Sequence, residues 1–287
     1  MARYGQSDNC LICSSVKVAS RLLAKARMRR FFTPIVVAML WLAAGTSPGI
    51  ALENLRVFRG VLILEGKIES GDYLSVRNFL RDESNFKKIS GGVFLASPGG
   101  SVLEALKIGR LIRELRLSTE APASPPPDRR DISAPLIRGR DLSNPGRYGC
   151  TSACFFLYVA GIYRTLNWAG RLGIHEPRME QIREGLTDND IANASARVRN
   201  AIKDYMADMN VPEKYLELMY SVPHSDVRWI TQEEFDADLK GYVPEVRRTL
   251  NERCGSLNEA EPHARQCITQ VKAELVTAAW RDVFRRN

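Results

Sequence analysis

Residues 91–102 read GGVFLASPGGSV, and this stretch decides the fold. Its first half, Gly91 to Ala96, is an unbroken run of small and apolar residues, which is typical of a strand buried on both faces. The sequence Ser97-Pro98-Gly99-Gly100 then ends the strand, because proline and glycine interrupt regular structure. A buried strand that passes through a glycine-rich turn into a helix is typical of a parallel α/β unit.

Strands and helices are expected to alternate on both sides of this stretch. Val102 to Leu115 carries apolar residues at the spacing of an amphipathic helix. Upstream, a strand over Gly60–Ile68 precedes a helix that begins near Tyr73. Downstream, Ala153–Ala160 is an apolar run typical of a buried helix, and Arg171–Pro177 is expected to be a short strand. This order predicts an α/β fold with a parallel sheet covered by helices.

The second half of the chain is expected to be helical. Thr231, followed by Glu234 three residues later, forms the pattern of a capping box. We predict an α/β domain over residues 52–243 and a helical C-terminal extension over residues 244–287. Residues 121–148 are rich in proline and charge, and they are predicted to be an exposed loop inserted in the domain. The helical periodicity covers Ile191–Met209, Pro212–Tyr220, Thr231–Leu239 and Pro262–Phe284.

The first 51 residues have the order of a secretory signal. A basic stretch ends at Arg29-Arg30, an apolar run follows from Phe31 to Ala44, and small residues precede the expected cleavage after Ala51. The alternative is an uncleaved N-terminal anchor in the inner membrane. In both cases the body of the protein is predicted to lie outside the cytoplasm, in the periplasm or secreted.

The net charge of +8 is concentrated ahead of the folded body. Residues 1–30 hold seven Lys and Arg and one acidic residue, and residues 31–51 hold no charge, which leaves 34 basic and 32 acidic residues in the rest. A nucleic-acid-binding surface needs positive charge clustered on the fold itself. The composition therefore argues against a nucleic-acid partner.

The cysteines agree with an oxidising compartment. Cys254 and Cys267 lie 13 positions apart in a polar region, and we expect them to form a disulfide. Cys150 and Cys154 are expected on one face of a helix, where a bridge is strained. We therefore expect them to be small buried residues first and a disulfide second.

Three short segments carry residues suited to catalysis. The N–H groups of Gly99 and Gly100 can approach and bind an oxygen atom. Ser152 begins the predicted buried helix among small neighbours, and His175 lies 23 positions later at the end of a strand, where open α/β folds gather their sites. Taken singly, each also has an ordinary structural explanation, namely a turn, an N-cap serine and a structural histidine.

Together and in this order, the three segments resemble the proteolytic subunit of the Clp protease and its crotonase-fold relatives. The likeness rests on LASPGGSV at 95–102, CTSAC at 150–154 with AGIYR at 160–164, and GIHEP at 173–177. It covers about residues 56–243, and it is nearest to a secreted, periplasmic branch with a Cys-x-Ser-x-Cys variant. The resemblance implies a Clp-protease/crotonase-like fold, in which homo-oligomers are common.

The resemblance also implies a serine-hydrolase site. Ser152 matches the family's nucleophile and His175 its general base. Asp226, which precedes an aromatic-containing turn, is the nearest match to the third catalytic residue, with a register uncertain by one position. The N–H groups of Gly100 and Ala153 match the oxyanion hole.

These residue types form a coherent chemical set. Serine is a weak nucleophile, so a base must take its proton as it attacks. Histidine can do this near neutral pH because its ordinary pKa is about 6.5. A carboxylate on the far ring nitrogen fixes the tautomer, and each oxyanion donor contributes roughly 3 kcal/mol in the transition state.

The chain departs from the Clp subunit in its flanking cysteines, its insertion and its C-terminal extension. A secreted chain also has no cytoplasmic ATPase partner, so ATP-driven degradation is not expected. A second relative, signal peptide peptidase A, uses a Ser–Lys pair. Lys203 is the candidate for that lysine here, but it falls on a predicted surface helix and ranks below His175.

The sequence therefore predicts a secreted or periplasmic serine hydrolase, a peptidase whose partner is a peptide or protein substrate. The alternative is a catalytically inactive binding or scaffold protein of the cell envelope with the same fold. The sequence holds no Gly-Lys-Ser/Thr phosphate loop and no Cys/His spacing suited to zinc, so neither a cofactor nor a metal is expected. Membrane contact is expected only through an uncleaved N-terminal segment.

Overall fold

The computed structural model describes residues 52, 55–90, 92–121, 149–166, 171–178 and 187–285. All of them belong to one unit, Thr46–Asn287. The predicted signal segment, residues 1–51, lies outside the described residues. The same holds for residues 122–148 of the predicted insertion.

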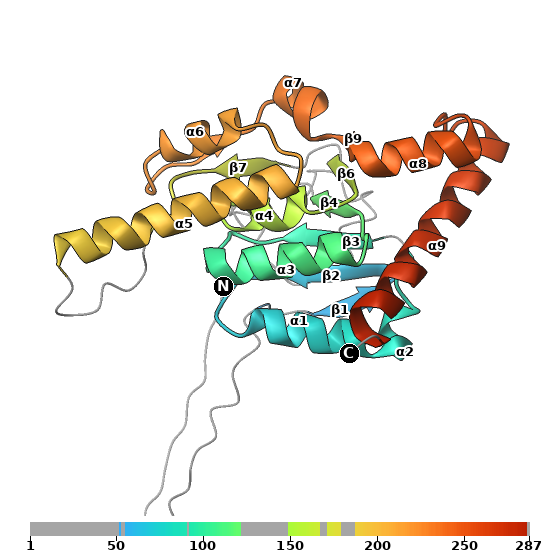
Figure 1. Ribbon diagram of the computed structural model, residues 1–287, viewed down its shortest axis with the longest axis horizontal. Coiled ribbons are helices and arrows are strands. Elements are labelled where there is room, and N and C mark those ends of the chain that lie inside the picture. The colour runs from blue at the N-terminus through green and yellow to red at the C-terminus, as the bar shows by residue number, and fades with distance from the viewer. Residues whose placement is uncertain are drawn as a thin grey trace, which may run out of the picture. The chain divides into compact units, whose positions relative to one another are not determined.

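A six-stranded sheet in the order β1-β2-β3-β4-β6-β9 carries the fold (Figure 1). Its four inner strands are parallel to one another, and the two edge strands run antiparallel. The expected α/β class is confirmed, and every residue of β3 is buried, as its apolar run predicts. The strands are β1 (Arg56–Phe58), β2 (Val61–Glu65), β3 (Gly92–Ala96), β4 (Thr119–Ala121), β6 (Tyr163–Leu166) and β9 (Gly241–Tyr242).

Short helices connect the parallel strands and bury their apolar stripes. α1 (Asp72–Arg81) and α2 (Glu83–Phe86) join β2 to β3, and α3 (Val102–Glu114) joins β3 to β4. α3 begins at Ser101, whose hydroxyl accepts a hydrogen bond from the N–H of Glu104. It packs against α1 on one side and α4 (Cys154–Val159) on the other, and all six residues of α4 are buried.

A second, three-stranded sheet stands at the end of β3. β5 (Cys150–Thr151) pairs parallel with β7 (Leu172–Ile174), and β7 pairs antiparallel with β8 (Arg228–Trp229). The N–H of Thr151 donates to the carbonyl of Ser97, 3.1 Å away, just after β3. The ends of β3, β5 and β7 therefore meet, as expected for the carboxyl ends of parallel strands.

The rest of the described chain is helical. The capping box expected at Thr231 and Glu234 is present at the start of α7. α8 lies in the segment predicted to be a helical extension, and proline at its first position is a frequent start signal. In Figure 1 the first turns of α5 extend past the sheet. The elements are α5 (Asp188–Asp208), α6 (Lys214–Tyr220), α7 (Gln232–Glu234), η2 (Phe235–Leu239), α8 (Pro244–Cys254) and α9 (Pro262–Arg285).

The C-terminal helices fold back onto the beginning of the domain. The disulfide expected between Cys254 and Cys267 joins α8 to α9. α9 then runs to α2, where Trp280 stacks on Phe86 at 5.6 Å and donates its indole N–H to the carbonyl of Leu80 (Figure 1). The end of α9 is therefore part of the same apolar core as the α/β sheet.

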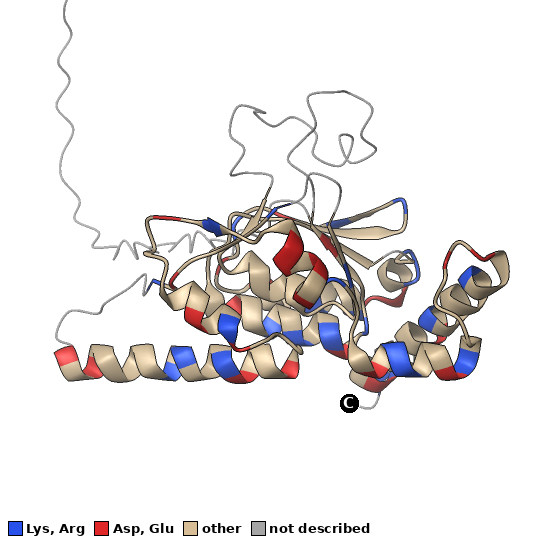
Figure 2. Ribbon diagram, turned by 90° about the horizontal axis from the view of Figure 1, so that it is seen from above, with Lys and Arg blue, Asp and Glu red and all other residues tan. Residues whose placement is uncertain are grey.

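Basic and acidic side chains are interspersed over the described helices (Figure 2). This agrees with the near balance of charge after residue 51. Within the described ranges, no helix combines the length and the apolar character needed to cross a membrane.

Candidate active site

The glycine turn after β3 packs too tightly to accept side chains. Gly99 and Gly100 have φ values of 98° and 134°, in the region that glycine favours. A Cβ on Gly99 would lie 2.5 Å from the Cβ of Ser152, and one on Gly100 would overlap the carbonyl oxygen of Ile68. Hydrogen bonds from the N–H of Ile68 to Gly99 and from the N–H of Ser101 to Ile68, both 2.8 Å long, fix this approach.

Ser152 occupies a sharp turn between β5 and α4. Its φ is 56°, an uncommon conformation for a residue other than glycine. Its N–H donates to the carbonyl of Gly173 in β7 at 2.9 Å, which locks the turn to the neighbouring strand. The side chain is partly buried, so the hydroxyl stands on a rigid turn with access to the surface.

Cys150 and Cys154 form a disulfide across this turn, which corrects the preferred expectation that they are unlinked buried residues. The expectation failed because it placed both cysteines on one helix. Cys150 instead lies in strand β5 and Cys154 begins helix α4, and the turn at Ser152 brings their Cα atoms to 5.1 Å. The bond therefore encloses Ser152 in a covalent loop.

His175 follows the last residue of β7 and is partly buried. Its Nδ1 lies 2.9 Å from the carbonyl oxygen of Glu176. A carbonyl only accepts hydrogen bonds, so Nδ1 carries the proton in the neutral ring and Nε2 is left as an acceptor. This is the tautomer that a histidine needs to accept a proton through Nε2.

One cavity of about 520 Å³ brings several of the expected site residues together. Ser152, His175 and Gly100 all line it, with Gly99 and Pro98 from the glycine turn. Ala153 is fully buried and is not among the lining residues.

The N–H groups expected to bind an oxyanion have no hydrogen-bond acceptor among the described residues. This holds for Gly100, beside the cavity, and for Ala153, next to Ser152 in the chain. Both donors are therefore available to a substrate oxygen that reaches them.

Asp226 is not joined to His175. It is exposed, its backbone N–H donates to the carbonyl of Pro223 at 2.9 Å, and no hydrogen bond links its carboxylate to the ring in the described structure. It lies two residues before Arg228, which pairs with Ile174 in β7, and it does not line the cavity. The resemblance assigned an acid as the hydrogen-bond partner of the far ring nitrogen of His175, and in the structure that partner is the Glu176 carbonyl.

The alternative lysine, Lys203, also lies apart from Ser152. It is exposed on α5, forms an ion pair of 2.7 Å with Glu213 and does not line the cavity. The hydrogen bond and charge of Glu213 raise the pKa of Lys203, whereas a lysine base needs a lowered pKa.

Two cations at the cavity were missed by the reasoning from sequence. Lys67 and Arg178 both line it, and Lys67 forms a long ion pair of 3.7 Å with Glu69. Lys67 lies two residues after the end of β2, and a charged residue just after a buried parallel strand is the signal that could have marked it. In the described part of the chain, no three His, Cys, Asp or Glu side chains are grouped to hold a metal ion.

The far end of α4 is held by arginines. Arg113 donates to the carbonyls of Ala160, at 2.8 Å, and Val159, at 3.3 Å, and Arg164 donates to that of Gly161, at 3.2 Å. Burial, together with the charge of Arg113, lowers the pKa of Arg164 to about 10, so it stays protonated at neutral pH. These cations lie where the carbonyl end of the helix carries negative partial charge.

Comparison with known proteins finds no matching family model and no matching curated protein. Solved structures that match include a ClpP1 point mutant from Listeria monocytogenes. The two chains share 17% identical residues and superpose with a TM-score of 0.41, over 62% of this chain and 86% of the Listeria chain.

Proposed function

We propose that this chain is a secreted serine hydrolase that acts as a peptidase, with Ser152 as nucleophile and His175 as general base. One observation carries the proposal. Ser152, held at a φ of 56° on a strand-to-helix turn, lines the same cavity as His175. Residues other than glycine in such conformations cluster at active sites, and a serine on this kind of turn is the nucleophile of many hydrolases.

The proposed reaction uses these groups in turn. Nε2 of His175 takes the hydroxyl proton as Oγ of Ser152 attacks the substrate carbonyl carbon, and a tetrahedral oxyanion forms. The N–H groups of Gly100 and Ala153 are the proposed donors to that oxyanion. His175 then returns the proton to the leaving amine, and water releases the acyl group through the same steps in reverse.

The proposal assigns the orientation of His175 to the Glu176 carbonyl. A hydrogen bond from Nδ1 to this carbonyl fixes the tautomer, as the acid of a triad does. A carbonyl carries no full charge, so it stabilises the imidazolium less than a carboxylate would. Asp226 remains a candidate for that second task if its segment moves towards the ring.

A peptide or protein substrate outside the cytoplasm suits this chain best. Two disulfides, one of them around Ser152, favour an oxidising compartment such as the periplasm. The N-terminal segment is proposed to direct export, either as a cleaved signal or as an inner-membrane anchor. A homo-oligomer is compatible with the proposal but is not required by it.

The first prediction tests the nucleophile directly. A fluorophosphonate probe, which forms an Oγ–P bond with loss of fluoride, is expected to label the full chain once, at Ser152. Peptide mass spectrometry locates the adduct, and heat-denatured protein serves as the control. Labelling at another residue contradicts the assignment, and inertness between about pH 6 and 9 favours the inactive binding or scaffold protein.

The second prediction separates the two ways of orienting His175. Asp226→Asn is expected to change the labelling rate by about threefold or less, because the Glu176 carbonyl already fixes the ring. In a Ser-His-Asp triad the same change costs about 10⁴-fold. A loss of that size shows that Asp226 reaches His175 during the reaction and overturns the role given to Glu176.

A further inference from the structure

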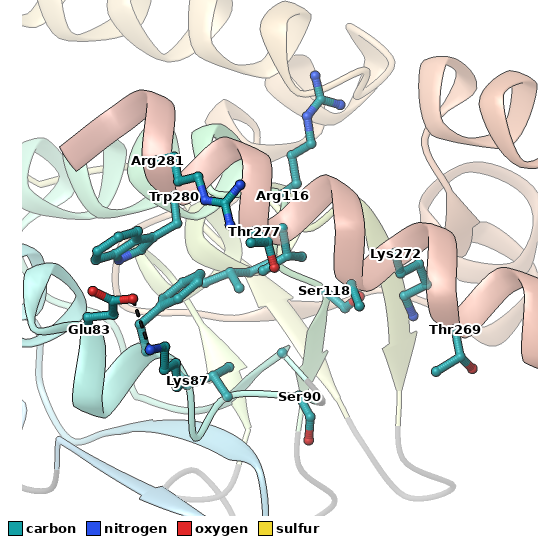
Figure 3. Close-up of a pocket in the computed structure, with 16 residues that line it drawn as sticks. Glu83, Lys87, Ser90, Arg116, Ser118, Thr269, Lys272, Thr277, Trp280 and Arg281 are labelled. Carbon is teal, nitrogen blue, oxygen red and sulfur yellow. Dashed lines mark ion pairs between the residues drawn. The ribbon is translucent and has the colours of Figure 1, made fainter. Parts of the chain in front are cut away.

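A second cavity, of about 460 Å³, lies between α9 and the strand-connecting segments of the α/β domain (Figure 3). α2 and the chain that follows it line one side, and the turn between α3 and β4 lines another. None of its lining residues lines the cavity at Ser152. It is therefore a separate candidate site, and nothing in the proposed hydrolysis uses it.

The floor of this cavity is apolar and aromatic. Phe86, Ile89, Leu117 and Trp280 line it and are each at most 8% exposed. The indole N–H of Trp280 donates to the carbonyl of Leu80, so the ring has no polar group left for a ligand. The floor therefore favours a hydrocarbon.

The polar rim is cationic. Glu83 is its acidic residue, and ion pairs of 3.0 Å to Lys87 and to Arg285 neutralise it. Lys272 and Arg281 also line the cavity, and within the described residues neither forms an ion pair of 4 Å or less, although the charge of Glu259 acts on Lys272 from farther away. An anion at this rim meets positive charge that the fold compensates only in part.

Lys272 is the cation best placed to hold an anionic head group. Its ammonium lies over the rings of Tyr163 and Tyr242, at 5.0 and 5.7 Å, and burial lowers its pKa. In Figure 3 it projects from α9 on the side of Ser118 and Thr269, whose hydroxyls can add hydrogen bonds. Lys272 is partly buried and has no ion pair within 4 Å in the described structure, and such a cation gains more from an incoming carboxylate than an exposed one does.

The cavity is elongated along α9. Residues from Thr269 to Trp280 line it at helical spacing, and eleven steps along a helix span about 17 Å. Lys272 stands near one end of this groove and the ring of Trp280 closes the other (Figure 3). Val276, which also lines the groove, lies between them along α9. A linear ligand matches this layout better than a compact one.

We propose that this groove binds a single-chain fatty carboxylate, with its carboxylate at Lys272 and its hydrocarbon chain along Val276 towards Trp280 and Phe86. The charge of the rim selects the anionic head, and the apolar floor selects the chain. A cavity of this volume is within the usual range for small-molecule sites.

The test is calorimetric titration of the full chain with dodecanoate below its micelle concentration. One dodecanoate per chain is expected to bind, while dodecyltrimethylammonium and acetate bind at least tenfold more weakly, because each lacks one of the two required features. Lys272→Met, which keeps the stem of the side chain, is expected to weaken dodecanoate binding about tenfold.

Matched variants separate the groove from general surface adsorption. Ala273→Trp fills the groove and is expected to abolish binding, whereas Ala278→Trp, on an exposed part of the same helix outside the lining, is expected to bind as the wild type does. Lys88→Met removes a positive charge beside α2 but outside the cavity lining, so it is the control for a general loss of positive charge. If Ala273→Trp melts at a lower temperature than the wild type, Thr277→Trp is used in its place as the groove-filling variant.

The proposal is overturned if dodecanoate does not bind. It is equally overturned if the cationic amphiphile binds as tightly, or if the groove-filling variants bind as well as Ala278→Trp.

Discussion

Ser152→Ala and His175→Gln are each expected to slow ester or peptide hydrolysis by about 10⁴-fold or more, and the double variant is expected to be no slower than either single variant. In the proposed mechanism the two side chains act as a unit, because the hydroxyl attacks only while the imidazole accepts its proton. Removal of either one leaves the same residual catalysis by substrate binding and oxyanion donors. The measurement is the rate of release of p-nitrophenol from an activated ester, together with the rate of fluorophosphonate labelling.

The chain contains its own matched controls. His224 and Ser225 are exposed neighbours of the same residue types and line neither cavity described above. His224→Gln and Ser225→Ala are expected to leave both rates unchanged. If the rate losses of the two site variants multiply fully in the double variant, the reaction does not pass through this pair. Normal labelling of Ser152→Ala would show the same.

Gly100→Ala is expected to destabilise the fold by about 3 kcal/mol or more and to remove activity. The added Cβ would overlap the carbonyl oxygen of Ile68, a backbone atom that cannot rotate away, and the φ of 134° is itself unfavourable for alanine. The bridge between Ile68 and Gly100 must then open, which displaces the turn beside Ser152. Urea unfolding followed by circular dichroism measures the change in the free energy of unfolding.

Gly71→Ala isolates the steric part of this effect. Gly71 also has a positive φ, of 98°, but a Cβ there would meet no atom within 4 Å. Only the backbone penalty remains, so a loss of about 1–2 kcal/mol with full activity is expected. If both variants lose the same stability, the close approach between Gly100 and Ile68 is not what constrains the turn.

The sequence predicts best those elements whose pattern is local. The unbroken apolar run of β3 and the stripe of α3 each repeat over enough residues to reveal their period, and both were placed within two residues. β8 and β9 have two residues each and depend on pairing with strands far away in the sequence. A two-residue strand shows no alternation, so only the folded chain reveals it.

The candidate site likewise has parts that the sequence predicts and parts that only the folded chain reveals. Motif order was enough to single out Ser152, His175 and Gly100, which line one cavity. The disulfide between Cys150 and Cys154 depends on where the helix begins, and helix boundaries are hard to read from a sequence. The contact of His175 with the Glu176 carbonyl involves the backbone, so no side-chain pattern could indicate it.

α4, the helix that follows Ser152, is held in place at both ends. At its start, the disulfide and the hydrogen bond to Gly173 hold the turn, and at its end Arg113 and Arg164 hold the carbonyls. A serine carried by a mobile segment must lose conformational entropy each time it meets a substrate. Here that loss is incurred once, when the chain folds and oxidises, so the proposed nucleophile is preorganised before any substrate arrives.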